Sequence, residues 1–336
     1  MPSARLTQRD IARLAKVSQT TVSLVLNNRA VRVPPETRER VLEVIRETGY
    51  QADPLARRMV EQRNQILGVF TYESVFPSST GDFYHPFLAG IEDCAERLGW
   101  DLLLFTSAPV TSGQRRIFHE NNRLRIADGC LLLGRRIPGD ELARLIAEDY
   151  PFVSVGRRDD AGGPVPYVGA DYGSATSALV ERAFALGHRR VAYVGPGAGA
   201  ESSTDRLRGF RRTAGRRARH VPTDRPAAEV LGTLVDARIT AVFVEERADA
   251  VALADAAADR GVDVPGDLSV IALGDATRPA TTGIEFSGFH VPRQEMGSQA
   301  TELLEAILSG RAEAGTQRLL PCELTEGTTL IAPKGT

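Results

Sequence analysis

The sequence predicts a small all-α head followed by an α/β body of two doubly wound subdomains, each with a parallel sheet. Short apolar segments at helical spacing fill the first part of the chain, whereas unbroken apolar strands alternate with amphipathic helices from Gln65 onward. The charge balance changes at the same boundary. Residues 1–63 carry 12 Lys and Arg against 7 Asp and Glu, whereas the whole chain has a net charge of −2. A basic head on a mildly acidic body indicates that only the head meets a polyanion.

The composition is that of an ordinary globular protein, with 42% hydrophobic and 25% charged residues over 336 positions. No apolar run approaches the roughly 20 residues that span a bilayer. The N-terminal stretch MPSARLTQRD lacks the apolar core of a secretory signal, so we expect a cytoplasmic protein. The isolated residues Cys94, Cys130 and Cys322 have no CxxC spacing, and we expect buried thiols without a disulfide framework or a metal site.

Two short helices are expected at the start of the head. Thr7 and Asp10 resemble a capping box, and the helix that follows has an apolar stripe at Ile11, Leu14 and Ala15. Ser18 can cap a second helix, which the Asn27–Asn28 pair ends. A tight turn joins the two, as in the first half of a helix-turn-helix.

A third helix is expected from Pro35 to Gly49, because proline favours the first turn and glycine the C-terminal end. Its apolar face, which would pack on the first two helices, consists of Val41, Leu42, Val44 and Ile45. Two short helices with a supporting third are the parts of a helix-turn-helix, which places the start of its second helix in the major groove of DNA.

The front of the second helix is rich in small polar residues that could reach base edges and phosphates. They are Ser18, Gln19, Thr20, Thr21 and Ser23. Glutamine suits adenine, and threonine offers a hydroxyl and a methyl group that can meet the thymine methyl. We also count Thr7 and Asn27 among the candidate DNA contacts. The alternative is a solvated helix in an unrelated three-helix scaffold.

Residues 6–60 resemble the DNA-binding head of the LacI/GalR family of bacterial repressors. The resemblance is carried by DIARLAKVSQTTVSLVLNN, VPPETRERVLEVIRETGY and ADPLARRM, in the family's order and spacing. It implies that Gln19, Thr20 and Leu24 lie where the family reads bases in the major groove. Many members carry arginine at the last of these positions, where it would contact guanine. Leucine cannot donate a hydrogen bond, so we expect a different base preference.

The segment ADPLARRMVEQR resembles the hinge helix of the family, and we assign residues 51–63 to it, between a head of residues 1–50 and a body of residues 64–336. The resemblance implies that Met59 wedges into the central minor-groove step, where relatives commonly carry leucine. Arg57 and Arg58 would lie against phosphates. The alternative is a disordered basic linker that acts by charge alone.

The body contains seven strand candidates at 66–70, 101–105, 129–134, 151–156, 190–195, 241–245 and 268–273, with helical patterns between them at 86–99, 174–187 and 248–261. Unbroken apolar strands separated by helices indicate parallel sheets that are covered on both faces. Seven such units fit two doubly wound subdomains with a cleft between them.

The family resemblance extends over the body through FLAGIEDCAERLGWDLLLF, GHRRVAYVGP and VPGDLSVIALGD, and it implies a periplasmic-binding-protein-like type I fold that senses an effector. The chain would then cross between subdomains near 164–166, 287–290 and 320–322. The N-subdomain would comprise residues 64–165 and 290–320, and the C-subdomain residues 166–288 and 322–336.

A ligand pocket is expected between the subdomains, at the carboxyl ends of the strands. The resemblance implies that Phe83 and Tyr84 line it and that Arg206 grips effector hydroxyls or carboxylates. The candidate effector contacts are Tyr72, Phe83, Tyr84, Arg157, Ser202, Arg206, Glu246 and Asp275. Many members have Asn-Asp where this chain has Glu246–Arg247. A sugar is the family's default ligand, but a charged ligand, or an empty cleft regulated by a protein partner, stays open.

Other functions find little support in the sequence. GPGAGA (195–200) satisfies a loose dinucleotide pattern, but the rest of that signature is missing, and we interpret it as a loop at the cleft mouth. The chain has no HExxH, GxSxG or Walker A sequence, so we expect no enzyme, metal or cofactor. A solute-binding protein would need export and no basic head. The basic run 206–220 is interpreted as a solvated helix and loop, or else as extra phosphate contacts.

We therefore expect a bacterial repressor that binds double-stranded operator DNA as a homodimer and is controlled by a small-molecule effector, with a sugar as the family's default ligand. A dimer is favoured because no long heptad tail follows Thr336. It would lie in the cytoplasm, on the nucleoid when bound to DNA, and would have no contact with a membrane. The sequence leaves open whether the effector releases the repressor from DNA or promotes its binding.

Overall fold

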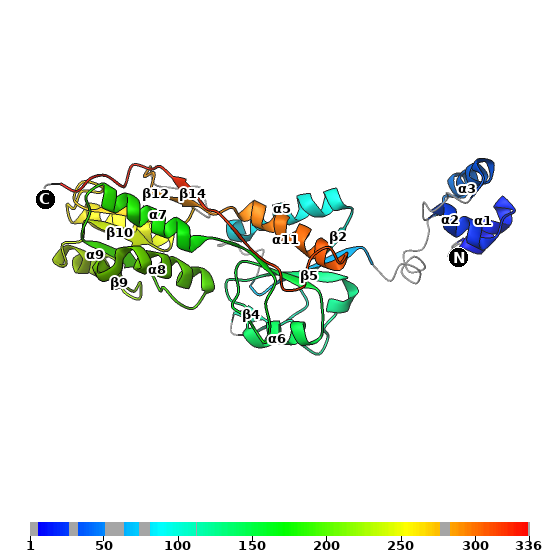
Figure 1. Ribbon diagram of the computed structural model, residues 1–336, viewed down its shortest axis with the longest axis horizontal. Coiled ribbons are helices and arrows are strands. Elements are labelled where there is room, and N and C mark those ends of the chain that lie inside the picture. Colours follow the sequence, from blue (N-terminus) through cyan, green and yellow to red (C-terminus); the bar gives the residue numbers. More distant parts are fainter. Residues whose placement is uncertain are drawn as a thin grey trace. The chain divides into compact units, whose positions relative to one another are not determined.

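The computed structural model describes residues 6–26, 33–50, 64–73, 81–111, 113–275 and 283–334. The chain divides into two compact units, Met1–Asn64 and Gln65–Thr336, which are the head and the body (Figure 1). The expected hinge at 51–63, with Arg57, Arg58 and Met59, lies outside the described residues, and so does Asn27.

The head consists of three helices, which are α1 (Gln8–Ala15), α2 (Gln19–Leu26) and α3 (Pro35–Thr48). Thr7 is the N-cap of α1, and both hydrogen bonds of the expected capping box to Asp10 are present. These hydrogen bonds from Thr7 hold the pKa of Asp10 below its ordinary value. Gly49 ends α3 with φ of +61°, in the left-handed region that glycine enters without strain.

A small apolar core holds the head together. Its buried residues are Ile11, Ala12, Ala15, Val22, Val25, Val41 and Tyr50. Two of the residues expected in this core are not buried, because the side chains of Leu14 and Leu42 are 51% and 37% exposed. Each of these helices is short and buries one narrow stripe, and both leucines lie beside that stripe.

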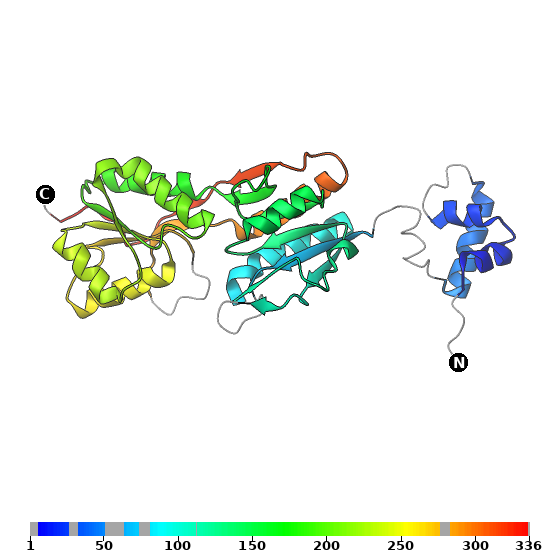
Figure 2. The ribbon, with the colours of Figure 1, turned by 90° about the horizontal axis from the view of Figure 1, so that it is seen from below.

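The body contains two six-stranded sheets (Figures 1 and 2). The first has the order β13-β7-β6-β5-β1-β2 and is parallel throughout. Its strands are β1 (Ile66–Thr71), β2 (Asp101–Phe105), β5 (Gly129–Leu133), β6 (Phe152–Val155), β7 (Tyr167–Ala170) and β13 (Gln317–Leu320). Outside both six-stranded sheets, β3 (Val110–Thr111) and β4 (Gln114–Arg115) form a two-stranded hairpin.

The second sheet has the order β14-β12-β11-β10-β8-β9 and is parallel except for β14, which pairs antiparallel with β12. Its strands are β8 (Val191–Val194), β9 (Ala218–Val221), β10 (Ala241–Val244), β11 (Ser269–Ala272), β12 (Ser287–His290) and β14 (Glu323–Thr325). All seven segments expected to be strands are strands of one of the two sheets.

Helices cover both sheets (Figure 2). Those of the first subdomain are α5 (Gly81–Leu98), α6 (Gly139–Ala147) and α11 (Arg293–Leu308), with the short 3-10 helix η2 (Leu124–Ile126). Those of the second are α7 (Tyr172–Ala185), α8 (Glu201–Ala214), α9 (Ala227–Asp236) and α10 (Arg247–Asp259), with η3 (Gly215–Arg217). Within the described residues, no helix is both long and apolar enough to cross a membrane.

The chain passes between the two subdomains three times. The first passage follows Ala170, later than the expected 164–166, because β7 pairs with β6 and β13 in the first sheet. The second lies between β12 of the second sheet and α11, which packs on α5 and on strands of the first. The third lies between β13 and β14. Three connecting segments therefore join the subdomains.

His188 fixes the C-terminal segment to the second subdomain. Its Nε2 lies 2.8 Å from the Ile331 carbonyl oxygen and its Nδ1 lies 2.9 Å from Thr240 Oγ1. The neutral ring satisfies both, since Nε2–H donates to the carbonyl and Nδ1 accepts from the hydroxyl. Burial lowers the pKa of His188 below its ordinary value of 6.5, so the folded chain holds this ring neutral.

Acid should therefore destabilise the body through His188. As pH falls below the unfolded pKa, the unfolded chain binds a proton that the folded chain does not, and stability falls by up to about 1.4 kcal/mol per pH unit until the folded pKa is reached. Urea unfolding of His188→Gln and of the unaltered chain at pH 7 and pH 5 measures this difference. The variant should lose less stability between the two pH values, and equal losses would show that His188 is not the titrating group.

Candidate nucleic-acid interface and ligand cleft

Helix α2 presents its polar residues outward and its valines inward. Ser18, Gln19 and Thr20 are exposed, whereas Val22 and Val25 are buried in the core of the head. This division follows from the helical repeat, which places the valines three residues apart on one face. The exposed first turn is thus free to approach a groove of DNA.

Hydrogen bonds within the described part of the head engage some of the polar side chains of this face and leave others without a partner. Ser18 Oγ accepts a hydrogen bond from the Thr21 backbone N–H at 3.1 Å and lies 2.9 Å from Thr21 Oγ1, so both hydroxyls serve the start of α2. Gln19 Oε1 accepts from Arg9 Nε at 3.4 Å. Within the described residues, the exposed Thr20 hydroxyl makes no hydrogen bond. Among the residues that the structure describes, the side-chain NH2 group of Gln19 and the hydroxyl of Thr20 are therefore left without a hydrogen bond.

Three other candidates for DNA contact have different surroundings. The Thr7 hydroxyl donates to Asp10 Oδ2 at 2.7 Å, which commits it to the start of α1. Ser23 and Leu24 are half-buried on the flank of α2. Leu24 offers an apolar surface beside the polar first turn.

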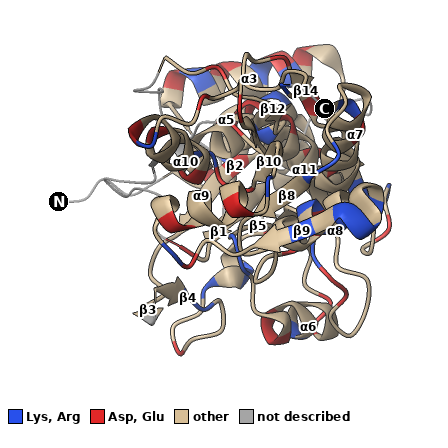
Figure 3. Cartoon of the chain, turned by 90° about the vertical axis from the view of Figure 1, so that its left-hand side faces the viewer, with Lys and Arg blue, Asp and Glu red and all other residues tan. Residues whose placement is uncertain are grey.

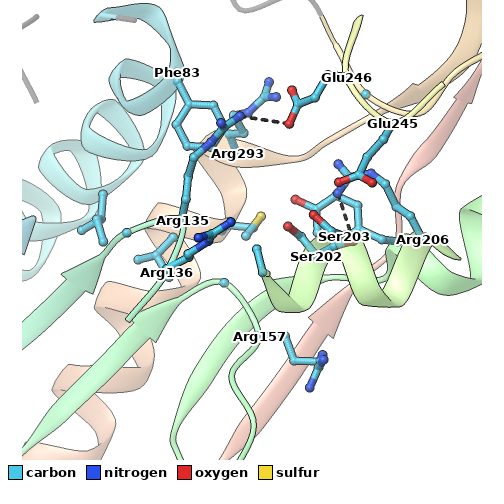
Figure 4. A pocket seen from close by; sticks show the side chains of 18 of the residues that line it. Phe83, Arg135, Arg136, Arg157, Ser202, Ser203, Arg206, Glu245, Glu246 and Arg293 are labelled. Atoms are coloured by element: carbon cyan, nitrogen blue, oxygen red, sulfur yellow. Dashed lines mark hydrogen bonds and ion pairs between the residues drawn. The ribbon is translucent and has the colours of Figure 1, made fainter. Parts of the chain in front are cut away.

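A cavity of about 200 Å³ lies between the two subdomains of the body, where strands of both sheets end (Figure 4). It is smaller than the roughly 300–1,000 Å³ of pockets that take drug-sized ligands. Seven of the eight expected effector contacts line it, namely Phe83, Tyr84, Arg157, Ser202, Arg206, Glu246 and Asp275. The carboxyl-end rule for parallel sheets explains their convergence from separate loops.

Tyr72 does not line the cavity, and its prediction as an effector contact is wrong. Its side chain is fully buried and packs edge-on against Phe70, with the ring centroids 5.0 Å apart. Side chains alternate along an extended chain, so Tyr72 points to the same face as Phe70, into the core behind the sheet.

Among the described residues of the body, four ion pairs cross the cleft, and in each the arginine comes from the first subdomain and the carboxylate from the second. They join Arg135 to Glu246 at 3.1 Å, Arg157 to Asp205 at 2.5 Å, Arg158 to Glu201 at 3.0 Å and Arg293 to Asp275 at 3.2 Å. Figure 4 shows the first of these above the cavity. Opposite charges on opposing walls favour a closed cleft.

Arg206 lies on α8, at the wall formed by the second subdomain, and aromatic and backbone contacts hold it there. Its guanidinium lies 3.8 Å from the centre of the Tyr172 ring, Nε donates to the Leu273 carbonyl at 2.8 Å, and Nη1 donates to the Ser202 carbonyl at 3.1 Å. A rigid guanidinium on an aromatic face is well suited to bind a ligand oxygen, because little side-chain freedom is lost on binding.

Two tyrosines donate their hydroxyls to neighbouring carboxylates, namely Tyr84, which lines the cavity, and Tyr193, whose partner Glu245 lines it. The Tyr84 hydroxyl donates to Glu73, and the Tyr193 hydroxyl donates to Glu245 Oε2 at 2.6 Å. Burial and the adjacent carboxylate raise the pKa of each tyrosine, which keeps both hydroxyls protonated as donors. Glu245 Oε2 also accepts from the Gly197 N–H at 3.0 Å. Tyr84 therefore contributes its ring to the cavity.

The sequence did not single out several residues of the cavity wall. They are Phe87, Arg135, Arg136, Arg158, Tyr172, Glu245 and Arg293. Arg247 also lines the cavity, and the sequence had offered it, with Arg206 and Glu246, as a residue that could recognise a charged ligand. The pairs Arg135–Arg136 and Arg157–Arg158 directly follow β5 and β6. Consecutive arginines after two buried parallel strands are the signal that could have found them, since strand ends line such clefts.

Two family models match the chain. Residues 7–53 match the bacterial regulatory proteins of the lacI family, and residues 180–330 match the periplasmic binding protein-like domain. The chain belongs to the LacI family. LacI-family members are DNA-binding transcriptional regulators with an effector-binding body, and they are not enzymes.

Curated relatives of this LacI-family chain span nearly its whole length. The HTH-type transcriptional repressor CytR of Escherichia coli strain K12 is 28% identical over 342 residues, which cover 97% of each chain. Catabolite control protein A of Staphylococcus xylosus is 26% identical over 310 residues, which cover 89% of this chain and 92% of the relative. Head and body thus occur together in these relatives as they do here.

Solved structures share the fold of this LacI-family chain. The lac repressor dimer bound to operator and the anti-inducer ONPF has a TM-score of 0.73 at 22% identity and covers 98% of this chain and 100% of its own. The CelR–cellobiose complex has a TM-score of 0.61 at 24% identity, covering 97% and 100%. A LacI family transcriptional regulator from Enterococcus faecium with bound ribose has 0.62 at 18%, covering 80% and 99%.

Proposed function

We propose that this LacI-family regulator is a homodimeric repressor whose affinity for operator DNA is switched by a small molecule in the cleft, with a sugar or sugar derivative as the ligand class. The observation that carries the proposal is the cavity itself, which lies between two subdomains and holds aromatic rings beside hydrogen-bonding groups. Relatives named as a repressor and as sugar-bound regulators support it.

The switch would work through closure of the cleft. A ligand that binds both walls favours the closed body, and in a dimer such closure changes the separation of the two heads. Operator affinity then changes by the ligand's differential binding to the two states, typically about 1–3 kcal/mol, or 5- to 150-fold. The proposed switch includes both a ligand that lowers operator affinity and a ligand that raises it. It places the protein in the bacterial cytoplasm, on the nucleoid when it is bound to DNA.

The DNA-reading residues in this proposal are those of the first turns of α2. Gln19 and Thr20 would contact base edges, Leu24 a thymine methyl or another apolar edge, and Ser18, Thr21 and Ser23 the flanking phosphates. Thr7 and Asn27 would add contacts to the DNA backbone at the two ends of the motif. From sequence resemblance alone, the proposal also includes Met59 as the minor-groove wedge with Arg57 and Arg58 on phosphates.

The substitution Leu24→Arg should change the preferred operator at one base pair in each half-site. Arginine can donate two hydrogen bonds to guanine, and one such pair discriminates by about 1–3 kcal/mol against the wrong base. Selection from a randomised operator library measures the preference of both proteins. A profile that is identical for Leu24→Arg and the unaltered chain would remove Leu24 from the reading face.

The repressor proposal is tested by footprinting on the DNA upstream of the chain's own gene. We expect protection of a pseudo-palindrome whose half-sites are related by the two-fold axis of the dimer. A screen of sugars, sugar acids and nucleosides by thermal shift would identify the ligand, because binding to the native state alone raises its stability. Absence of any protected palindrome across that DNA would contradict the proposal.

A further inference from the structure

The cavity carries more arginine charge than its surroundings neutralise. Its seven arginines are Arg135, Arg136, Arg157, Arg158, Arg206, Arg247 and Arg293. Four of them form the cross-cleft ion pairs. The other three, Arg136, Arg206 and Arg247, have no carboxylate partner among the described residues.

The carboxylates of the cavity are already engaged. Glu246 pairs with Arg135, and Asp275 pairs with Arg293 while it accepts the Val291 N–H at 2.8 Å. Glu245 is only 3% exposed and accepts from the Tyr193 hydroxyl and the Gly197 N–H. Those neutral donors leave Glu245 without a cationic partner among the described residues, so three unpaired guanidinium groups stand against one unpaired carboxylate and the cavity keeps an excess of positive charge.

Arg136 lies against the start of α8. A methyl group added at Gly199 would come within 2.5 Å of Arg136 Nη2, so the guanidinium covers the loop that leads into the helix. Figure 4 shows Arg136 extending across the cavity toward Ser202. The N-cap residue Ala200 has no side chain to cap the helix, and Glu201 of the first turn pairs with Arg158. A cation beside the positive end of a helix is unfavourable unless an anion lies between them.

A buried serine, Ser203, and a half-buried one, Ser202, complete this corner of the cavity. Ser203 lines the cavity with only 8% of its surface exposed, and its hydroxyl makes no hydrogen bond within the described part of the chain. Ser202 lines the cavity one residue earlier. The loop before them has φ of +63° at Gly197 and +89° at Gly199, in the left-handed region that glycine enters without strain, and its residues Ala198 and Ala200 line the cavity. A buried hydroxyl without a partner needs a ligand or solvent oxygen.

Resting on the proposed function, we propose that the effector is a small polyhydroxylated anion, with a phosphate or carboxylate group that binds at this corner. Arg136, the Ser202 and Ser203 hydroxyls and the first N–H groups of α8 would hold the anionic group. A planar guanidinium and a helix N-terminus are the two donor sets that best match phosphate and carboxylate oxygens. The hydroxylated part would extend toward Phe83 and Arg206.

The test compares neutral sugars with their charged counterparts at constant ionic strength. Calorimetry on the full-length chain would measure ribose against ribose 5-phosphate and ribonate, and glucose against glucose 6-phosphate and gluconate, with inorganic phosphate alone as the minimal probe. We expect saturable binding of inorganic phosphate and binding of at least one sugar anion that is 10-fold or more tighter than its neutral parent. The affinities of the sugar phosphates and of the sugar acids then show whether this corner binds a phosphate or a carboxylate group more tightly.

Arg136→Gln should weaken binding of the anions by about 10- to 100-fold, the size of a lost charge-assisted hydrogen bond. Arg125→Gln is the matched control, because Arg125 pairs with Glu148 away from the cavity and its loss should leave anion binding unchanged. Equal affinity of Arg136→Gln and the unaltered chain for these anions would overturn the inference, as would anions that bind no better than their neutral parents.

The same experiment separates failure of this inference from failure of the proposed function. Neutral sugars that bind in the cleft and change operator affinity, without any preference for anions, would overturn the anionic class and leave the effector-controlled repressor intact. If no small molecule of either kind changes operator affinity, the proposed function itself fails.

Discussion

Replacing Gln19 and Thr20 together by alanine should weaken operator binding by about 30-fold or more and leave non-specific DNA binding nearly unchanged. Each good base contact is worth about 1–3 kcal/mol of discrimination, and two lost contacts combine to at least about 2 kcal/mol. Both side chains are exposed on α2, and alanine favours a helix, so the head should stay folded. Fluorescence anisotropy with operator and scrambled DNA measures both affinities.

The salt dependence of binding provides the internal control for this double variant. No charge is removed, so the slope of log affinity against log salt should stay the same within each DNA. Glu43→Ala, on the exposed surface of α3, controls for truncation of a side chain in the head. A double variant that binds operator as tightly as the unaltered chain would show that α2 is not the reading helix.

Asp205→Asn should open the cleft of the ligand-free body. The side chains of Asp205 and Arg157 are only 12% and 16% exposed, and their 2.5 Å contact joins opposite subdomains. Arginine does not deprotonate in proteins, so the Arg157 guanidinium stays charged when its buried partner is removed. Breaking a buried pair from one side costs up to about 3–5 kcal/mol. The loss of the Arg157 contact falls on the closed state, whereas the exposed Arg208 contact of Asp205 lies within α8 and is lost in both states.

Small-angle X-ray scattering measures the opening as a larger radius of gyration, and thermal unfolding measures the lost stability. Asp140→Asn is the matched control, because Asp140 pairs with Arg116 within the first subdomain and lies away from the cavity. An Asp205→Asn chain with an unchanged radius of gyration and unfolding midpoint would show that the cross-cleft pairs do not hold the subdomains together.

The buried strands of the body were predictable because parallel strands covered on both faces are apolar throughout. β5 (GCLLL) and β10 (AVFV) are such strands. The strands that the sequence did not reveal are short or polar, such as β9 (ARHV), β13 (QRLL) and β14 (ELT), which lie at sheet edges. An edge strand is exposed to solvent along one side, so its sequence need not be apolar throughout. Such a strand is recognised only by its hydrogen bonds to the neighbouring strand.

The sequence predicted where the candidate site lies, but it predicted only some of the residues that form it. The carboxyl-end rule located the cavity, and helical spacing located the face of α2. The ion pairs between Arg158 and Glu201 and between Arg293 and Asp275 depend on how the two subdomains close on each other, which no local pattern encodes. Tyr72 was mispredicted for a related reason, because the face to which it points depends on where β1 ends.

The basic run 206–220 forms the later part of α8, η3 and most of β9, and Figure 3 shows the blue of its arginines on α8. Arg208, Arg211 and Arg212 are exposed, whereas Arg206 turns to the cavity. One helix therefore carries both a solvated surface and a residue of the cleft, which a count of charges along the sequence could not separate.

In the proposed function, a ligand in the cleft controls how tightly the head holds operator DNA. The most direct measurement is the operator affinity of the purified full-length chain, by fluorescence anisotropy, with and without a saturating concentration of the molecule found by the thermal-shift screen. We expect a 5- to 150-fold change in the operator dissociation constant and no comparable change with scrambled DNA. An operator affinity that stays the same while the cleft is occupied would contradict the account.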